Sequence, residues 1–144
     1  MIVNYQDHDS SSPGRQDYNN GTWNYDGHNG IDFTMKSFAQ MDAPGGVAVL
    51  AAADGVVKST ADGEYDHDSC GVTGGTCSYS SAFGNNIEIE HANGQHTRYA
   101  HLKTGSLLVA PGDTVKRGQQ IAQVGSSGNS SDAHLHFMVK APPA

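Results

Sequence analysis

Short runs of alternating apolar and polar residues, separated by close turn signals, most constrain how this chain folds. In "NNIEIEH", Ile87 and Ile89 fall on one face of an extended segment, and two glutamates fall on the other. "ANGQ" then supplies an Asn-Gly turn at Asn93-Gly94, which is typical of a tight β-hairpin. We therefore expect "QHTRYAHL" to return as the paired antiparallel strand.

The same pattern recurs in the rest of the chain. "APGGVAVLAAADGVVKST" is interpreted as two short strands joined by a tight turn at residues 53–55, with a helix over "VAVLAAA" as the weaker alternative. "SLLVA", "TVKRG" and "QQIAQVG" follow as short extended segments, and "HLHFMVK" is the last strand. No region has a convincing helical period, and the 18 glycines favour frequent turns. The sequence predicts an all-β fold of short, mainly antiparallel strands with hairpin turns.

The length of 144 residues suggests one compact domain. Residues 1–24 are polar and interrupted by "SSSPG" and "NNG", so we expect an irregular or extended N-terminal arm before a single domain over residues 25–144. Residues 61–83 resemble a loop insertion. Four acidic residues alternate there, but their spacing does not match an EF-hand, which favours a solvated loop over a calcium site: Asp62, Glu64, Asp66 and Asp68.

The charge balance limits the class of partner. Eight basic and 15 acidic residues give a net charge of −7 without a Lys/Arg cluster, which argues against a nucleic-acid or anionic-membrane partner. No apolar run approaches the length of a transmembrane helix, so we expect no membrane insertion. The start "MIV" is too short for a signal peptide, and a targeting segment would lie outside this sequence. We expect a monomer.

Cys70 and Cys77 flank the glycine-rich run "GVTGGT". This flexible segment lets the two cysteines close a small disulfide loop, which favours an oxidising compartment. The alternative is two unrelated free thiols. A zinc site built on these cysteines is not expected, because the spacing is not C-x-x-C and no second pair exists.

"HNGIDF" places two metal-ligand side chains, His28 and Asp32, four residues apart. A helix would put them on one face, but Asn29-Gly30 is a strong turn signal and a poor helical pair. A straight strand would separate their Cα atoms by about 13 Å. We therefore expect a bend, with His28 at the end of a loop and Asp32 at the start of a strand.

"HLHF" supplies two more histidines. On a strand, His134 and His136 share one face, while Leu135, Phe137 and Val139 form an apolar row on the other. Two imidazoles and one carboxylate, from His28, Asp32 and one of this pair, suit zinc and leave a fourth position for water. Such a site activates water for hydrolysis of an amide.

The remaining histidines carry less information by themselves. His101 ends "RYAHL", where strand alternation places it on the face of Thr97 and Tyr99. Tyr25 is a candidate hydrogen-bond donor to an oxyanion, or a residue on the rim of the site. Four histidines without such neighbours are expected at the surface: His8, His67, His91 and His96.

Taken in order, "HNGID", "YAHL" and "HLHF" resemble the lysostaphin-type, or LytM-domain, zinc endopeptidases. The resemblance covers about residues 25–140. It implies a largely antiparallel β fold with the site in a groove, one zinc ion held by His28, Asp32 and His136, and a catalytic pair formed by His101 and His134. It further implies an extracytoplasmic enzyme, secreted or periplasmic, that cuts peptide cross-links or bridges of bacterial peptidoglycan.

The sequence departs from the family pattern in places. "SSDAHLHF" stands where many relatives have Gly-Pro before the first histidine, and the insertion at residues 61–83 is longer than usual. Two other hypotheses are a non-catalytic module that binds cell wall or regulates another hydrolase, and a structural zinc protein with His134 as a fourth ligand. All five site residues are present, which favours the enzyme.

Overall fold

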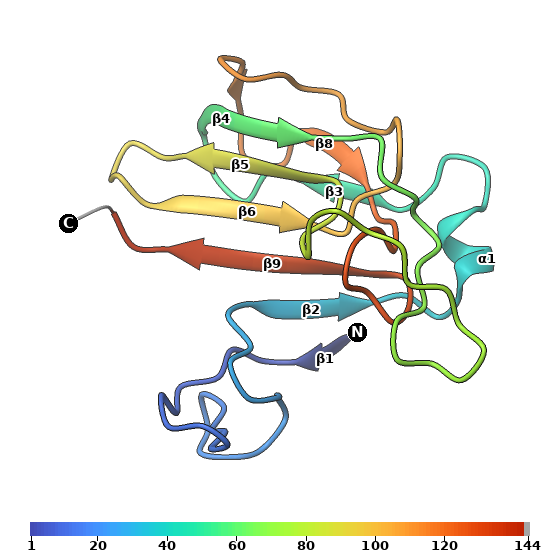
Figure 1. Ribbon diagram of the computed structural model, residues 1–144. Helices are drawn as coiled ribbons and strands as arrows, with labels where there is room; N and C mark the ends of the chain where they lie inside the picture. Colours follow the sequence, from blue (N-terminus) through green and yellow to red (C-terminus); the bar gives the residue numbers. More distant parts are fainter. Residues whose placement is uncertain (143–144) are drawn as a thin grey trace.

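The computed structural model describes residues 1–142 as an almost all-β protein. Seven strands form one antiparallel sheet in the order β1-β2-β9-β6-β5-β4-β7, and β3 and β8 form a second, two-stranded sheet (Figure 1). The all-β prediction is confirmed. The strands are β1 Ile2–Asn4, β2 Ile31–Thr34, β3 Ala48–Leu50, β4 Gly55–Ala61, β5 Asn86–Glu90, β6 His96–Ala100, β7 Thr114–Val115, β8 Gln120–Gln123 and β9 His134–Lys140.

The β5–β6 hairpin forms as the alternation predicts. Ile87 lies opposite Tyr99 and Ile89 lies opposite Thr97, so these four side chains share one face of the sheet. Both isoleucines are fully buried, which contributes about 1.5–3 kcal/mol each to folding. β9 lies between β2 and β6, and this placement brings the last strand beside "HNGIDF".

The large sheet and the β3–β8 pair (Figure 1) both contribute residues to one hydrophobic core. Leu135 and Phe137 of β9 pack against this core, so β9 directs alternate residues inward and His134 and His136 to the opposite face. The buried core residues are Val49, Ala51, Val57, Ile87, Ile89, Tyr99, Leu102, Val115, Ile121, Ala122 and Val124.

The two strands expected in "APGGVAVLAAADGVVKST" both form, as β3 and β4, but the turn between them leads from one sheet to the other: β3 pairs with β8, while β4 pairs with β5 and β7. Other local expectations are wrong. "SLLVA" forms no strand, although Leu107 and Val109 still pack on the core. A single α-helical turn, α1 (Phe38–Met41), begins at Ser37, whose side chain accepts a hydrogen bond from the Gln40 amide. A four-residue helix is too short to show a period in the sequence.

The apolar row of β9 ends before Val139, which is 53% exposed, whereas Met138 on the opposite face is buried. Within the expected N-terminal arm, β1 pairs antiparallel with β2 at the edge of the large sheet. No helix within residues 1–142 combines the length and apolarity needed to cross a membrane.

Candidate metal centre

The "HNGIDF" stretch bends as expected, and both residues of the Asn29-Gly30 pair have a role beside His136. His28 lies in a loop and Asp32 lies in β2. A Cβ atom on Gly30 would come within 2.8 Å of the His136 ring and 2.6 Å of the Phe137 carbonyl oxygen. Asn29 contributes its Oδ1, which lies 3.1 Å from His136 Nε2. Gly30 therefore leaves room for a ring that Asn29 orients.

Three side-chain atoms converge at this bend. His28 Nε2 lies 3.1 Å from Asp32 Oδ1 and 3.2 Å from His136 Nδ1, and the latter two atoms are 2.8 Å apart. His136 faces Asp32 directly across β2 and β9, which places both side chains on one face of the sheet. All three residues are buried. Within the described residues, they form the group of His, Cys, Asp or Glu side chains that are close enough together to hold a metal ion.

The outer ring nitrogens of the two histidines have oxygen partners. His28 Nδ1 lies 2.7 Å from the Tyr5 carbonyl oxygen, and His136 Nε2 faces Asn29 Oδ1. Because an oxygen acceptor requires an N–H there, each inward nitrogen carries a lone pair. Three acceptors that face one another need a cation or a shared proton between them. Ligand atoms of a tetrahedral zinc site lie about 3.3 Å apart, so the set fits zinc.

The electrostatics of Asp32 support the same conclusion. Burial by itself raises the pKa of this carboxyl group, but the imidazoles of His136, His28 and His134 around it hold the pKa well below its usual range. Asp32 is therefore ionised wherever the protein is folded at ordinary pH. A buried carboxylate beside two imidazole nitrogens is a typical ligand set for a divalent transition metal.

His101 reaches the site by a route that alternation does not predict. The expectation that it shares a face with Thr97 and Tyr99 is wrong, because those side chains point into the core. His101 follows the end of β6 with φ of +59°, a left-handed conformation that turns its side chain toward the opposite face. Its ring centroid lies 4.6 Å from that of His134 and 5.8 Å from that of His136.

His101 and His134 are both buried, and each is held through Nδ1. His101 Nδ1 lies 2.7 Å from the Ser127 carbonyl oxygen, and His134 Nδ1 lies 2.9 Å from the Asp132 carbonyl oxygen. These contacts leave both Nε2 atoms free to accept a proton. Burial, together with the neighbouring His134 imidazole, lowers the pKa of His101 to about 3, so His101 is neutral at neutral pH.

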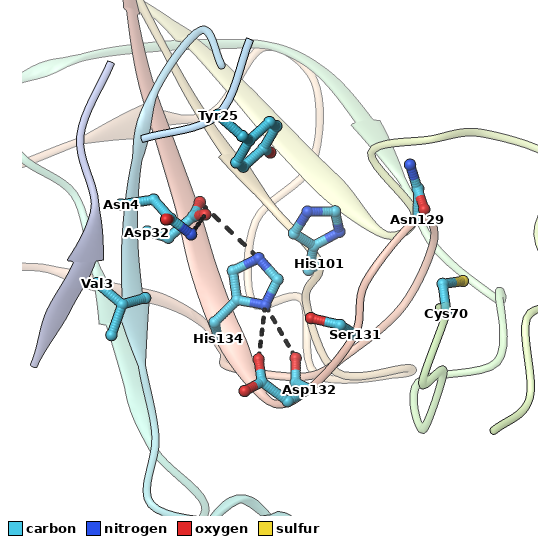
Figure 2. A pocket seen from close by; sticks show the side chains of 10 residues that line it. All are labelled: Val3, Asn4, Tyr25, Asp32, Cys70, His101, Asn129, Ser131, Asp132 and His134. Carbon is cyan, nitrogen blue, oxygen red and sulfur yellow. Dashed lines mark hydrogen bonds and ion pairs between the residues drawn. The ribbon is translucent and has the colours of Figure 1, made fainter. Parts of the chain in front are cut away.

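His134 is close to the ligand group but does not join it. Its Nε2 atom lies 3.8 Å from Asp32 Oδ1, and Figure 2 shows its ring between Asp32 and Asp132. The ligand-type cluster in the described part of the chain contains three residues without His134. A metal held by three protein ligands keeps an open position, which is typical of catalytic rather than structural sites.

Tyr25 stands at the edge of the site between two hollows. One hollow of about 280 Å³ lies between β1 and the loop at residues 129–132 (Figure 2), and one of about 190 Å³ lies beside Phe83. Tyr25, His101 and Asn129 line both. The Tyr25 ring lies 4.4 Å from that of His28, and partial burial together with Asp32 raises its pKa to about 12. The hydroxyl therefore stays protonated and can donate a hydrogen bond.

The insertion at residues 61–83 packs beside the segment that leads into His134. Cys70 and Cys77 form the expected disulfide, and Cys70 lines the larger hollow. The Cys70 amide donates to the Ser130 carbonyl oxygen at 2.8 Å, and the Asp68 amide donates to that of Ser126 at 2.9 Å. The insertion therefore contacts the loop that leads into His134.

The four acidic residues of the insertion accept hydrogen bonds from backbone amides, and they range from exposed Asp62 to buried Asp68. Asp66 accepts a hydrogen bond from the Thr104 amide and Asp62 accepts one from Gly105, both in the turn that follows His101. Glu64 accepts hydrogen bonds from the amides of Ser80 and Ser81. Buried Asp68 accepts one from the Ser78 amide.

Sequence reasoning missed the contribution of the N-terminal arm. Asn4 donates from Nδ2 to Asp32 Oδ2 at 3.0 Å, and the Tyr5 carbonyl oxygen faces His28. No motif in the arm signals either contact. Of the four histidines expected at the surface, His67, His91 and His96 are only partly exposed, and each has hydrogen-bond partners.

Comparison with known proteins gives a consistent result. Residues 26–142 match the family described as Peptidase family M23. The chain is 34% identical over 110 residues to the peptidoglycan DD-endopeptidase ShyA of Vibrio cholerae, covering 76% of this chain and 19% of that protein. It is 38% identical over 116 residues to the DD-carboxypeptidase/endopeptidase Mpg of Neisseria meningitidis, covering 81% and 20%.

The chain spans about a fifth of the length of these curated relatives. Among solved structures, it resembles the catalytic domain of the antimicrobial peptidase lysostaphin from Staphylococcus simulans with a TM-score of 0.55 and 28% identity. That match covers 82% of this chain and 71% of the other.

Proposed function

Since the chain belongs to peptidase family M23, a family of metallopeptidases, we propose that it is a zinc-dependent endopeptidase that hydrolyses peptide bonds in bacterial peptidoglycan. The observation that carries the proposal is the convergence of His28, Asp32 and His136 on one point, beside the buried imidazoles of His101 and His134. The name of the relative in Vibrio cholerae, a peptidoglycan DD-endopeptidase, supports the substrate class.

Zinc is the metal that the donor set favours. Two imidazole nitrogens and one carboxylate oxygen suit zinc better than calcium or magnesium, which prefer oxygen ligands alone. His28, Asp32 and His136 would hold the zinc ion, which would supply Lewis-acid activation of water and of the scissile carbonyl at neutral pH.

The protein's own residues then handle protons and the oxyanion. His101 offers a free Nε2 atom beside the ligand group, and the family resemblance places it in the catalytic pair, so it is the candidate base that accepts a proton from the attacking water. His134, held through Nδ1, is the candidate partner that stabilises the oxyanion or returns a proton to the leaving amine. Tyr25 keeps its hydroxyl proton and can donate to the oxyanion from the rim.

The two hollows suggest how a peptide lies in the site. They share Tyr25, His101 and Asn129 and extend in different directions, one toward β1 and the other toward Phe83. A peptide that lies across these shared residues occupies one hollow with each side of the scissile bond. This arrangement favours an endopeptidase, because chain continues on both sides of the cut.

The compartment follows from the substrate and the disulfide. Peptidoglycan lies outside the cytoplasm, and the disulfide between Cys70 and Cys77 persists in oxidising surroundings. We therefore propose that the domain acts in the periplasm or outside the cell.

The test is digestion of purified peptidoglycans that differ in cross-link chemistry, with and without a zinc chelator. Mass spectrometry of the released fragments identifies the bond. We expect chelator-sensitive release of peptide fragments, restored by added zinc. Absence of cleavage by zinc-loaded protein, together with co-sedimentation on the wall, would overturn the proposal in favour of a non-catalytic wall-binding module.

A further inference from the structure

A lateral row of side chains crosses the large sheet at the metal centre. Asn4 of β1 lies opposite Asp32 of β2, and Asp32 lies opposite His136 of β9. Residues that face each other across antiparallel strands share a face of the sheet. Asn4 is therefore in the same row as two metal ligands, although it lies outside residues 26–142, which match the family.

A β-bulge places Asn4 in this row. Ile2 pairs with Phe33 and Asn4 pairs with Asp32, so β1 holds one extra residue between the two pairs. A regular ladder starting from the Ile2–Phe33 pair would put the apolar Val3 opposite Asp32 instead. Bulges beside functional sites commonly redirect a side chain in this way.

The two oxygens of Asp32 have separate partners. Oδ2 accepts a hydrogen bond from Asn4 Nδ2 at 3.0 Å, and Oδ1 faces His28 Nε2 and His136 Nδ1. A side-chain amide can meet a carboxylate only through its N–H₂ group, so the orientation of Asn4 is determined. The contact occupies the carboxylate oxygen other than the one that faces the two histidines.

The backbone next to Asn4 holds a second ligand. The Tyr5 carbonyl oxygen lies 2.7 Å from His28 Nδ1, and the Asp7 amide donates to the His28 carbonyl oxygen at 2.7 Å. The arm therefore contacts two of the three metal ligands from outside. Groups that orient metal ligands in this way typically change metal affinity by about 10- to 100-fold when removed.

We propose that Asn4 is a positioning residue of the metal centre, whose amide occupies Oδ2 of Asp32 and confines metal binding to Oδ1. The proposal rests on the proposed function only in that it requires a metal at His28, Asp32 and His136. It assigns a part of the site to a segment outside the family match.

The test compares Asn4→Leu, which has nearly the same volume and no donor, with the wild-type protein. We expect the dissociation constant for zinc, measured by competition with a chelating dye, to rise about 10-fold or more. Asn19→Leu is the matched control, because it makes the same change at an exposed position of the same arm, and it should leave the zinc affinity unchanged. Asn4→Ala is a second variant in case Asn4→Leu does not fold.

Cobalt substitution separates positioning from general damage. With Oδ2 released, Asp32 can bind through both oxygens, so the visible absorption of the cobalt-loaded variant should lose intensity as the coordination number rises. Weaker zinc binding with an unchanged cobalt spectrum would overturn the claim, as would unchanged zinc affinity. Failure of the wild-type protein to bind zinc or cobalt would overturn the proposed function as well. The other outcomes bear only on the role of Asn4.

Discussion

The N-terminal arm (residues 1–24) and the insertion (residues 61–83) are alike in composition, but they contact different parts of the site. Both are polar and turn-rich, and both line the larger hollow, through Asn4 on one side and Cys70 on the other. The arm contacts Asp32 and His28, two of the three proposed metal ligands. The insertion contacts the loop before His134. Two irregular segments thus support different halves of one site.

The two segments are also fastened differently. In the arm, the Asp7 carboxylate accepts hydrogen bonds from the amides of Gln16 and Gly27, and Asp17 similarly collects those of Asn19, Gly21 and Trp23. The insertion has comparable acid anchors and, in addition, a disulfide. Acid should therefore loosen the arm, and reduction should loosen the insertion.

The largest effect expected is that of His134→Ala on turnover. Removal of a group that moves protons or stabilises the oxyanion lowers kcat by about 10²- to 10⁴-fold. Because His134 lies outside the ligand group, bound zinc measured by elemental analysis should remain near one per chain. His136→Ala is the comparison variant and should lose zinc and activity together. Equal loss of zinc in both variants would contradict the separation of His134 from the proposed metal ligands.

Gly30→Ala should have the second-largest effect, and it should weaken metal binding by the proposed ligand group. The added methyl group meets the His136 ring and the Phe137 carbonyl oxygen, so the His136 ring or the backbone at Gly30 must shift, and the ligand geometry changes. We expect zinc affinity to fall by about 10- to 100-fold, measured by dye competition. Circular dichroism of the metal-free variant checks that the sheet still forms, and unchanged zinc affinity would mean that the close approach is not needed.

Replacing both cysteines, Cys70→Ser with Cys77→Ser, should affect turnover through the loop before His134 and should leave metal binding intact. Loss of this small loop closure lowers the free energy of unfolding by about 2–3 kcal/mol. Loosening of the loop before His134 should lower kcat or raise KM several-fold while zinc affinity stays unchanged. Reduction of the wild-type protein with a phosphine that binds zinc poorly should reproduce the result. A fall in zinc affinity would show that the insertion also supports the metal.

The smallest effect should be the acid sensitivity of the arm. Hydrogen bonds from the Gln16 and Gly27 amides lower the pKa of Asp7, and one from the Gly21 amide leads those that lower the pKa of Asp17. A carboxyl whose pKa is depressed on folding stabilises the fold above its unfolded value, near 4, and this stabilisation is lost as the pH falls through the folded value.

Hydrogen exchange of metal-free protein at pH 5 and pH 2.5 measures this loss. The amides that donate to the Asp7 carboxylate, those of Gln16 in the arm and of Gly27 just after it, should lose protection at the lower pH before those of the disulfide-closed segment. Asp7→Asn should remove much of the difference between the two pH values at Gln16. Equal loss of protection in both segments would contradict the contrast.

The sequence predicts those features that depend on neighbours in the chain. Alternation and an Asn-Gly turn were sufficient for the β5–β6 hairpin, and the i, i+2 spacing placed His134 and His136 on one face. The assignment of β3 and β4 to different sheets depends on partners 25 or more residues away along the chain, which no local pattern encodes.

The site shows the same limit. The left-handed backbone of His101 is uncommon for a residue other than glycine, so alternation places the side chain on the wrong face. The contact between Asn4 and Asp32 depends on a bulge and on strands separated by 28 positions in sequence. Roles that the family resemblance assigns to single residues remain predictions until the variants are measured.

The left-handed backbone at His101 also determines which substitution at this position would remove the imidazole without straining the fold. Glycine and asparagine adopt this conformation readily, whereas a β-branched residue is strained there. His101→Asn therefore deletes the imidazole and keeps the main-chain path between β6 and Leu102. A protein disarmed in this way should bind uncut wall fragments without degrading them, and could serve as a capture reagent for isolating the natural substrate.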